Sequence, residues 1–213
     1  MADDTKNGVI KFYDYIGSDS SLSIVNASSI FTFNNKTSSI RELILPDNVT
    51  GLTLEGYVAN YTLPSTLSAL RLNLDANTAI SVPVLTIPSS VKSLSYSHTY
   101  GLEPIKELDL QQVTQVTALT LLSYHGPISI NQSTSVVLNI SGLTEELYIT
   151  PNTLRATTQK INCSLLNSTS LDNIIEGLMS TTSVVYCYLS KSLSQLTDDQ
   201  IIRALNKGWF LVF

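Results

Sequence analysis

One ten-residue pattern occurs three times and constrains the fold more than any other feature of this chain. It reads aliphatic, proline, two small polar residues, aliphatic, two variable positions, leucine, one variable position and a large apolar residue. The copies span residues 45–54, 63–72 and 87–96. Because proline fixes φ and lacks an N–H, it suits a corner at the end of a strand. The alternating apolar tail predicts a short strand with one buried face.

A corner followed by a strand, repeated along a chain, is typical of one turn of a solenoid. The prolines are spaced by eighteen and then twenty-four residues, close to the usual repeat length of about 20–29. We expect Leu70, Leu94 and Leu119 to point into one shared core. The predicted strands of the repeats cover residues 40–45, 49–54, 67–74, 91–96, 105–110, 116–122, 135–140, 145–149 and 160–165.

The three copies resemble the leucine-rich repeats of the BspA-like and FNIP types, in which a Leu/Ile-Pro-Ser-Ser-Val corner feeds a short strand. Residues 168–211 are similar to the C-terminal cap of BspA-like proteins of gut bacteria and of the phages that infect them. That similarity rests on Leu-Thr-Asp-Asp-Gln at 196–200 and Asn-Lys-Gly-Trp at 206–209. The resemblance implies a leucine-rich-repeat solenoid, and such repeats serve mainly as binding scaffolds.

The chain of 213 residues is expected to form a single, mainly β solenoid domain with three parts. Residues 1–38, with strands expected at 9–16, 22–25 and 30–33, lack the proline corner and are predicted to form an N-terminal β cap and attachment segment. Degenerate leucine-rich repeats follow over residues 39–167. A small α/β cap closes the chain over residues 168–213, since the ends of a repeat stack need atypical units.

The periodicity changes in the predicted C-terminal cap. Apolar residues at helical spacing between 171 and 178 predict a helix, with Ser170 as its N-cap. A strand is expected over residues 184–189. Thr197 and Gln200 are placed to form the capping box of a second helix, with Gly208 at its C′ position. The apolar face of that helix is expected to contain Ile201, Ile202 and Leu205, and residues 209–213 to form a final strand or apolar plug.

Charge and hydropathy limit the partners of the chain. The net charge is −5 and only 14% of residues are charged, which argues against nucleic acid because phosphate binding needs clustered Lys and Arg. No apolar run approaches the length of about 18 residues that a membrane helix needs. The start of the chain lacks the features of a signal peptide. We therefore expect a protein used without standard secretion, or one whose signal was removed before residue 1.

The residues that could carry chemistry are few. Cys163 and Cys187 lie in apolar alternating runs and are expected to be buried structural thiols, with a disulfide as the alternative. His98 and His125 are the only histidines, and no hydrolase, phosphate-binding or zinc-protease motif accompanies them. Glu107 and Asp109 share one face of an expected strand, which favours a solvated face over an acid/base pair. We expect no enzyme, no cofactor and no metal site.

One aromatic pattern indicates a binding surface. Tyr57, Tyr100 and Tyr124 each follow a core leucine by five or six residues, and His98 and His125 fall in the same loops after the strands. In a stack these loops lie along one edge, where the five side chains would form a binding ridge. The alternative is that the tyrosine rings cover the core with their hydroxyls in water.

Three classes of function remain. The first is a non-enzymatic structural or binding component of a bacteriophage virion, decorating the capsid or tail or forming a fibre that contacts the host. The others are a bacterial cell-surface BspA-like adhesin and an unrecognised hydrolase. The missing signal peptide favours the virion over the cell surface, because phage proteins are released by lysis.

The ends of the chain predict an assembly. The polar start contrasts with the apolar run 209–213, and an exposed apolar run usually marks an interface. We expect a homo-oligomer or a virion-bound copy with protein partners, attached through the first ~10 residues. A host surface glycan or protein is a further candidate partner.

Overall fold

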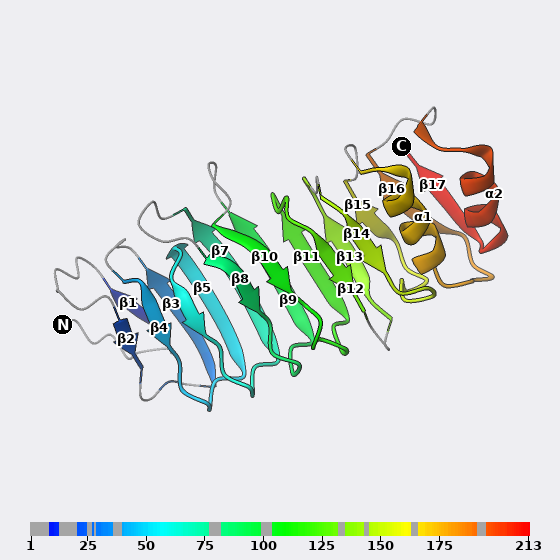
Figure 1. The fold of residues 1–213 in the computed structure, drawn as a ribbon. Helices are drawn as coiled ribbons and strands as arrows, with labels where there is room; N and C mark the ends of the chain where they lie inside the picture. The colour runs from blue at the N-terminus through cyan, green and yellow to red at the C-terminus, as the bar shows by residue number, and fades with distance from the viewer. Residues whose placement is uncertain are drawn as a thin grey trace.

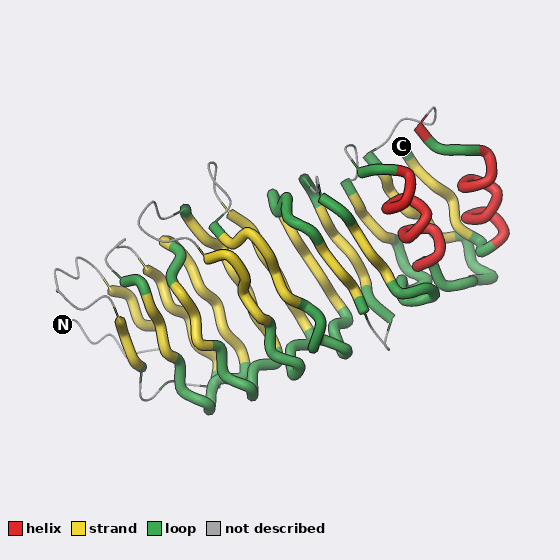
Figure 2. Tube along the Cα trace, viewed as in Figure 1, coloured by secondary structure: helices red, strands yellow, loops and turns green. Residues whose placement is uncertain are grey.

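The protein is mainly β, with parallel sheets. In its computed structural model the described residues are 9–12, 21–24, 27, 29–35, 40–76, 82–98, 104–131, 135–142, 145–162, 166–190 and 195–213. Figures 1 and 2 show strands that follow one another side by side from the N-terminal to the C-terminal end of the molecule, with two helices at the C-terminal end. Residues 1–8 of the predicted attachment segment, and residues 13–16 of the first predicted strand, lie outside the described residues.

The larger sheet has ten strands in the order β1-β3-β5-β7-β9-β11-β13-β15-β16-β17. Each neighbouring pair is parallel. The strands are β1 (Val9–Phe12), β3 (Ile30–Asn35), β5 (Gly51–Tyr57), β7 (Ala69–Asp75), β9 (Ser93–His98), β11 (Ala118–Leu122), β13 (Val137–Ile140), β15 (Gln159–Ile161), β16 (Val185–Leu189) and β17 (Trp209–Val212).

The even-numbered strands from β2 to β14 form three small parallel sheets, with the orders β2-β4-β6, β10-β8 and β12-β14. They are β2 (Ser21–Ser23), β4 (Glu42–Ile44), β6 (Asn60–Thr62), β8 (Val82–Thr86), β10 (Ile105–Asp109), β12 (Ile128–Ile130) and β14 (Leu147–Ile149). Helices α1 (Ser168–Gly177) and α2 (Asp198–Asn206) continue this layer beyond β14 (Figure 1).

The core lies between the two layers and is built from rows of side chains in register. Leu70, Leu94 and Leu119 are paired positions on neighbouring strands and are at most 2% exposed, so the prediction of one shared core is confirmed. Each such leucine contributes about 1.5–3 kcal/mol when fully buried. The full row contains Phe31, Leu52, Leu70, Leu94, Leu119 and Leu138.

The proline corners are closed turns. In each corner the backbone N–H of the aliphatic residue donates to the proline carbonyl three residues earlier, at 3.1–3.3 Å. The aliphatic residues Val49, Leu67 and Val91 are fully buried. Their side chains therefore fill the corner, and the strands begin two residues later than the sequence predicts, at Gly51 and its counterparts.

A side-chain rung connects consecutive corners. The second residue after proline donates to a backbone carbonyl of the preceding turn of chain: Thr66 Oγ1 to Val49 O at 2.9 Å, and Ser90 Oγ to Leu67 O at 2.5 Å. Asn48 makes a comparable bond to an earlier carbonyl. These bonds satisfy carbonyls that point along the stack, which explains why small polar residues follow each proline.

Three short strands were not expected from the sequence, namely β6, β8 and β12. Strand β8 contains Pro83, which reads as a strand breaker. It pairs only with β10 and is therefore an edge strand, the position in a sheet where proline is tolerated. Strands β6 and β12 have three residues each, too few to show a period.

The C-terminal cap differs from the prediction in two details. The N-cap of α1 is Asn167 rather than Ser170, because Asn167 Oδ1 accepts from Ser170 N at 2.8 Å. Ser170 is buried, and its hydroxyl accepts from Leu147 N at 3.2 Å. On α2, Ile202 and Leu205 are exposed and not part of the buried face, which contains Gln200 and Ala204.

Other features of the cap are confirmed. Thr197 and Gln200 form the capping box of α2. Gly208 has φ +85, and a Cβ there would lie 2.3 Å from Thr181 O, so only glycine fits. The final run forms β17, where Trp209 is buried and donates to Met179 O at 2.8 Å.

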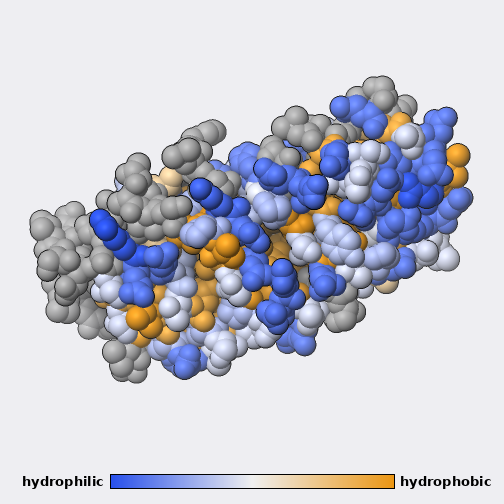
Figure 3. Space-filling model, viewed as in Figure 1, coloured by the Kyte–Doolittle hydropathy of each residue, from blue (hydrophilic) through white to orange (hydrophobic). Residues whose placement is uncertain are grey.

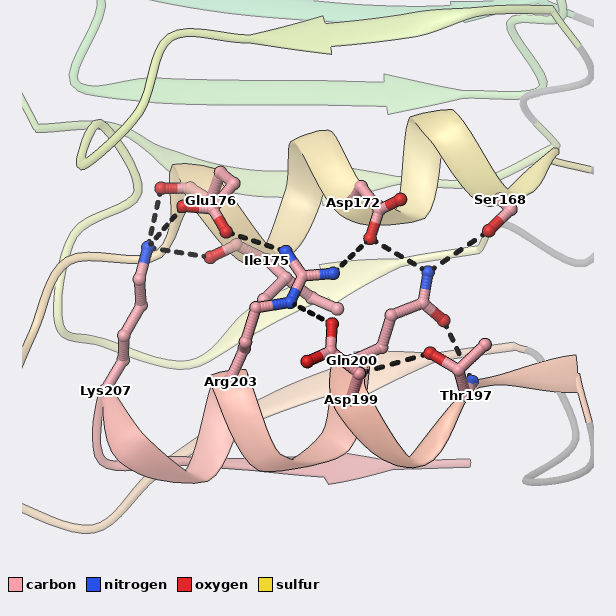
Figure 4. Close-up of polar contacts among 9 residues, drawn as sticks. All are labelled: Ser168, Asp172, Ile175, Glu176, Thr197, Asp199, Gln200, Arg203 and Lys207. Atoms are coloured by element: carbon pink, nitrogen blue, oxygen red, sulfur yellow. Dashed lines mark hydrogen bonds and ion pairs between the residues drawn. The ribbon is translucent and has the colours of Figure 1, made fainter.

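An ion cluster joins the two helices (Figure 4). Arg203 forms ion pairs with Asp172 and Glu176 on α1, the latter at 2.7 Å. It also pairs with Asp199 on its own helix, at 2.8 Å. Lys207 donates to the carbonyls of Ile175 and Glu176 at 3.0 and 2.8 Å, which caps the end of α1. These bonds hold α2 against α1.

Candidate functional site

Four of the five predicted ridge residues lie at or just beyond the C-terminal ends of strands that share one edge of the large sheet. Tyr57 ends β5 and His98 ends β9, two strands apart, while His125 follows β11. The His98 and His125 rings lie 6.1 Å apart at 67°, and Tyr57 is 36% exposed. The structure therefore brings His98 and His125 together, while Tyr100 lies outside the described residues.

Tyr124 is not a surface residue, which corrects its assignment to the exposed ridge. Its side chain is fully buried, and its ring packs edge-on against Tyr96 with centroids 5.4 Å apart. The hydroxyl accepts from Leu108 N at 3.0 Å and lies 3.3 Å from Lys106 O. The spacing rule that selected it marked a loop position correctly but did not distinguish inward from outward side chains.

A small groove of about 200 Å³ lies between β10 and β12, where the short-strand layer is interrupted. Glu107 is exposed there, and Asp109 accepts from Gln111 N at 3.0 Å. Glu146 and the half-exposed Tyr148 line the same groove. Asp109 is thus held by its own turn, an arrangement that suits a solvated strand face.

An exposed group of three aromatic side chains was not predicted from the sequence. Tyr186, Tyr188 and Phe210 project from β16 and β17 and are 42%, 44% and 47% exposed. The Tyr186 ring centroid lies 6.3 Å from that of Tyr188 and 6.1 Å from that of Phe210. We call these three residues the aromatic patch. The alternation of residues 185–189 could have revealed it, because the two tyrosines fall on the face opposite Cys187.

A shallow groove of about 520 Å³ adjoins the aromatic patch at Tyr188. Its polar lining comes from the outer face of β15 and from the residues that flank β15 and β16. Lys160 is exposed and paired with Tyr188 across the two strands. The remaining polar residues of the groove are Thr158, Asn162 and Ser190.

The surface of the short-strand layer differs from this outer face. Figure 3 shows polar residues over much of the helical cap and apolar residues among the short strands. Ile44 and Val84 are exposed on those strands, at 37% and 47%. They are single aliphatic side chains on separate strands, and such scattered apolar residues need no functional explanation.

Within the described ranges, no three His, Cys, Asp or Glu side chains lie close enough together to bind a metal ion. Cys187 is buried, while Cys163 is outside the described residues. No helix in the described part of the chain has the length and apolar content that crossing a membrane requires.

Comparison with protein-family models, curated proteins and solved structures finds no match.

Proposed function

We propose that this chain is a single-domain leucine-rich-repeat solenoid of the BspA-like and FNIP types, and that it acts without catalysis as a binding and structural component of a bacteriophage virion. It would decorate the capsid or tail, or contact the host as part of a fibre. The observation that carries the scaffold role is the unbroken register of the core row from Phe31 to Leu138. Such a stack gives an extended, rigid surface.

The BspA-like assignment is supported by the C-terminal cap. The segment that resembles BspA-like caps folds into a compact unit in which a capping box, Gly208 and Trp209 each have a structural role. These are the residues on which the resemblance rests. The proposed location is the virion, with protein partners in a larger assembly and with neither nucleic acid nor a membrane as the binding partner.

Assembly is supported by the exposed apolar side chains at the C-terminal end. Leu205 is 46% exposed and Ile202 is 54% exposed on α2, while Phe213 is 48% exposed at the end of the chain. Apolar side chains gathered at one end of a stack suit a contact with another copy or with the particle.

The test is mass spectrometry of purified virions and, separately, of the host cell envelope. We expect peptides of this chain in the particles at a stoichiometry that fits a structural component. Peptides confined to the host envelope would contradict the proposal and favour the adhesin. Turnover of a substrate that disappears in the His98→Ala, His125→Ala double variant would instead favour the hydrolase.

The attachment segment has its own test. Deleting residues 2–8 should leave the melting temperature unchanged and abolish incorporation into the particle. A truncated chain that still assembles would show that attachment lies elsewhere, with the C-terminal apolar residues as the next candidate.

A further inference from the structure

The aromatic patch has the geometry of an open platform. Tyr186 and Phe210 are paired positions on β16 and β17, and Tyr188 lies two residues further along β16. The ring pairs are tilted by 39° and 46° with centroids more than 6 Å apart, so the rings do not cover one another. Each therefore keeps part of a flat face accessible to a ligand.

Polar side chains border this platform at Tyr188. The groove at Tyr188 presents the ammonium group of Lys160, the amide of Asn162 and the hydroxyls of Thr158 and Ser190. Binding sites for small molecules combine apolar or aromatic surface with a few polar groups that fix orientation. The patch and the groove together supply both within a continuous surface of β15, β16 and β17.

We propose that this surface binds an oligosaccharide, with two neighbouring sugar rings on the aromatic patch and the next ring in the groove beside Lys160. A sugar ring has an apolar C–H face, which packs on an aromatic ring, and a rim of hydroxyls, which needs both donors and acceptors. Lys160 donates, Asn162 does both, and the hydroxyls of Thr158 and Ser190 do both. The site thus matches the two-sided chemistry of a sugar.

Other ligand classes fit less well. Bases also stack on aromatic rings, but a single-stranded nucleic acid needs a positively charged groove. Lys160 is the one basic residue lining this groove among those described, and the net charge of the chain is −5. The inference deepens the proposed function, since it rests on a binding role and specifies a glycan as the ligand class.

The experiment is affinity electrophoresis and calorimetry of the full chain with defined probes. The probes are cello-, xylo-, manno-, malto- and chitohexaose, dextran, and purified capsular polysaccharide from gut bacteria, with the oligonucleotide dT15 as the competing class. We expect binding of at least one carbohydrate, and a loss of about tenfold or more in affinity for each of Tyr186→Ala and Tyr188→Ala. Because both rings are about half exposed, the melting temperature should change little.

The matched control is Tyr148→Ala, which removes an aromatic side chain of similar exposure, 50%, from the opposite layer. It should bind as the unchanged protein does, whereas Lys160→Ala should weaken binding without affecting the fold. The inference is overturned if no carbohydrate probe binds, if dT15 alone binds, or if Tyr148→Ala loses as much affinity as Tyr188→Ala. Detection in virions does not depend on these results, so the two proposals fail separately.

Discussion

The hydroxyl of Tyr124 accepts a hydrogen bond from the backbone N–H of Leu108 at 3.0 Å, at the edge of β10 where a neighbouring strand would otherwise bind. Its own proton has two acceptors within reach, Lys106 O at 3.3 Å and Pro127 O at 3.2 Å. The Tyr124 side chain thus takes a hydrogen bond that a paired strand would otherwise make to β10. Strands β10 and β12 accordingly belong to different small sheets. Gly126 permits this approach, because a Cβ there would lie 2.3 Å from Lys106 O.

Removing that hydroxyl should destabilise the protein. We expect Tyr124→Phe to lower the free energy of unfolding by about 1–3 kcal/mol, because the buried N–H of Leu108 is left unsatisfied. Urea unfolding would measure the change. Tyr148→Phe, which alters a half-exposed ring, should be neutral. Equal effects of the two variants would contradict the structural role of the Tyr124 hydroxyl.

A charge in the core row should prevent folding. Leu94→Asp places a carboxylate at a position that is 1% exposed, and an unpaired buried charge costs several kcal/mol or more. Ser95→Asp is the control, because Ser95 faces outward beside Arg71 in the next strand. A Leu94→Asp protein that is soluble and melts cooperatively near the temperature of the unchanged protein would refute the shared core.

The corner rungs should each contribute modestly to stability. Thr66→Val and Ser90→Ala remove the hydroxyls that bond the preceding turn, and each should cost about 1 kcal/mol. Thermal melts would measure the loss. Ser89→Ala changes an exposed neighbour and should have no effect. If all three variants melt alike, the rungs do not stabilise the stack.

The cap cluster predicts an acid-dependent loss of stability. Partial burial raises the pKa of Asp172, but bonds from Gln200 and Arg203 outweigh it and hold that pKa below its ordinary 3.8. The hydrogen bond from Arg203 is the main cause that holds the pKa of Glu176 below its ordinary 4.5. Both carboxyls therefore stabilise the fold fully when the pH is above these ordinary pKa values. That stabilisation disappears as the pH falls through the lowered pKa values of the folded protein.

Arg203→Met should remove most of this pH dependence. At pH 7 we expect it to cost roughly 1 kcal/mol, because the partners are partly exposed and screened by water. The difference in melting temperature from the unchanged protein should shrink as the pH falls from about 5 to 3. Arg71→Met, at an exposed position on the outer sheet face, is the control. A difference that stays constant with pH would show that the lost bonds do not depend on charged carboxyls.

The local structure of this fold could be predicted from the sequence. Proline, small polar residues and alternating leucines predict a corner and a one-faced strand, because the φ restriction of proline and the two-residue period of a strand depend only on neighbours in the chain. The capping box at Thr197 and the position of Gly208 are equally local, and both are confirmed. The cores of the repeats could be predicted for the same reason.

Tertiary packing decided what has no period in the sequence. Tyr124 is buried because its hydroxyl bonds the edge of β10 at Leu108 N. Ser170 is a buried acceptor because the backbone N–H of Leu147 lies beside its hydroxyl. Tyr186 and Phe210 form one patch only because strands twenty-four residues apart pair in parallel register. Neighbouring residues in the sequence specify the turns and the buried face of each strand. The way the turns stack decides which distant strand edges and faces meet. The surface available for binding follows from that stacking.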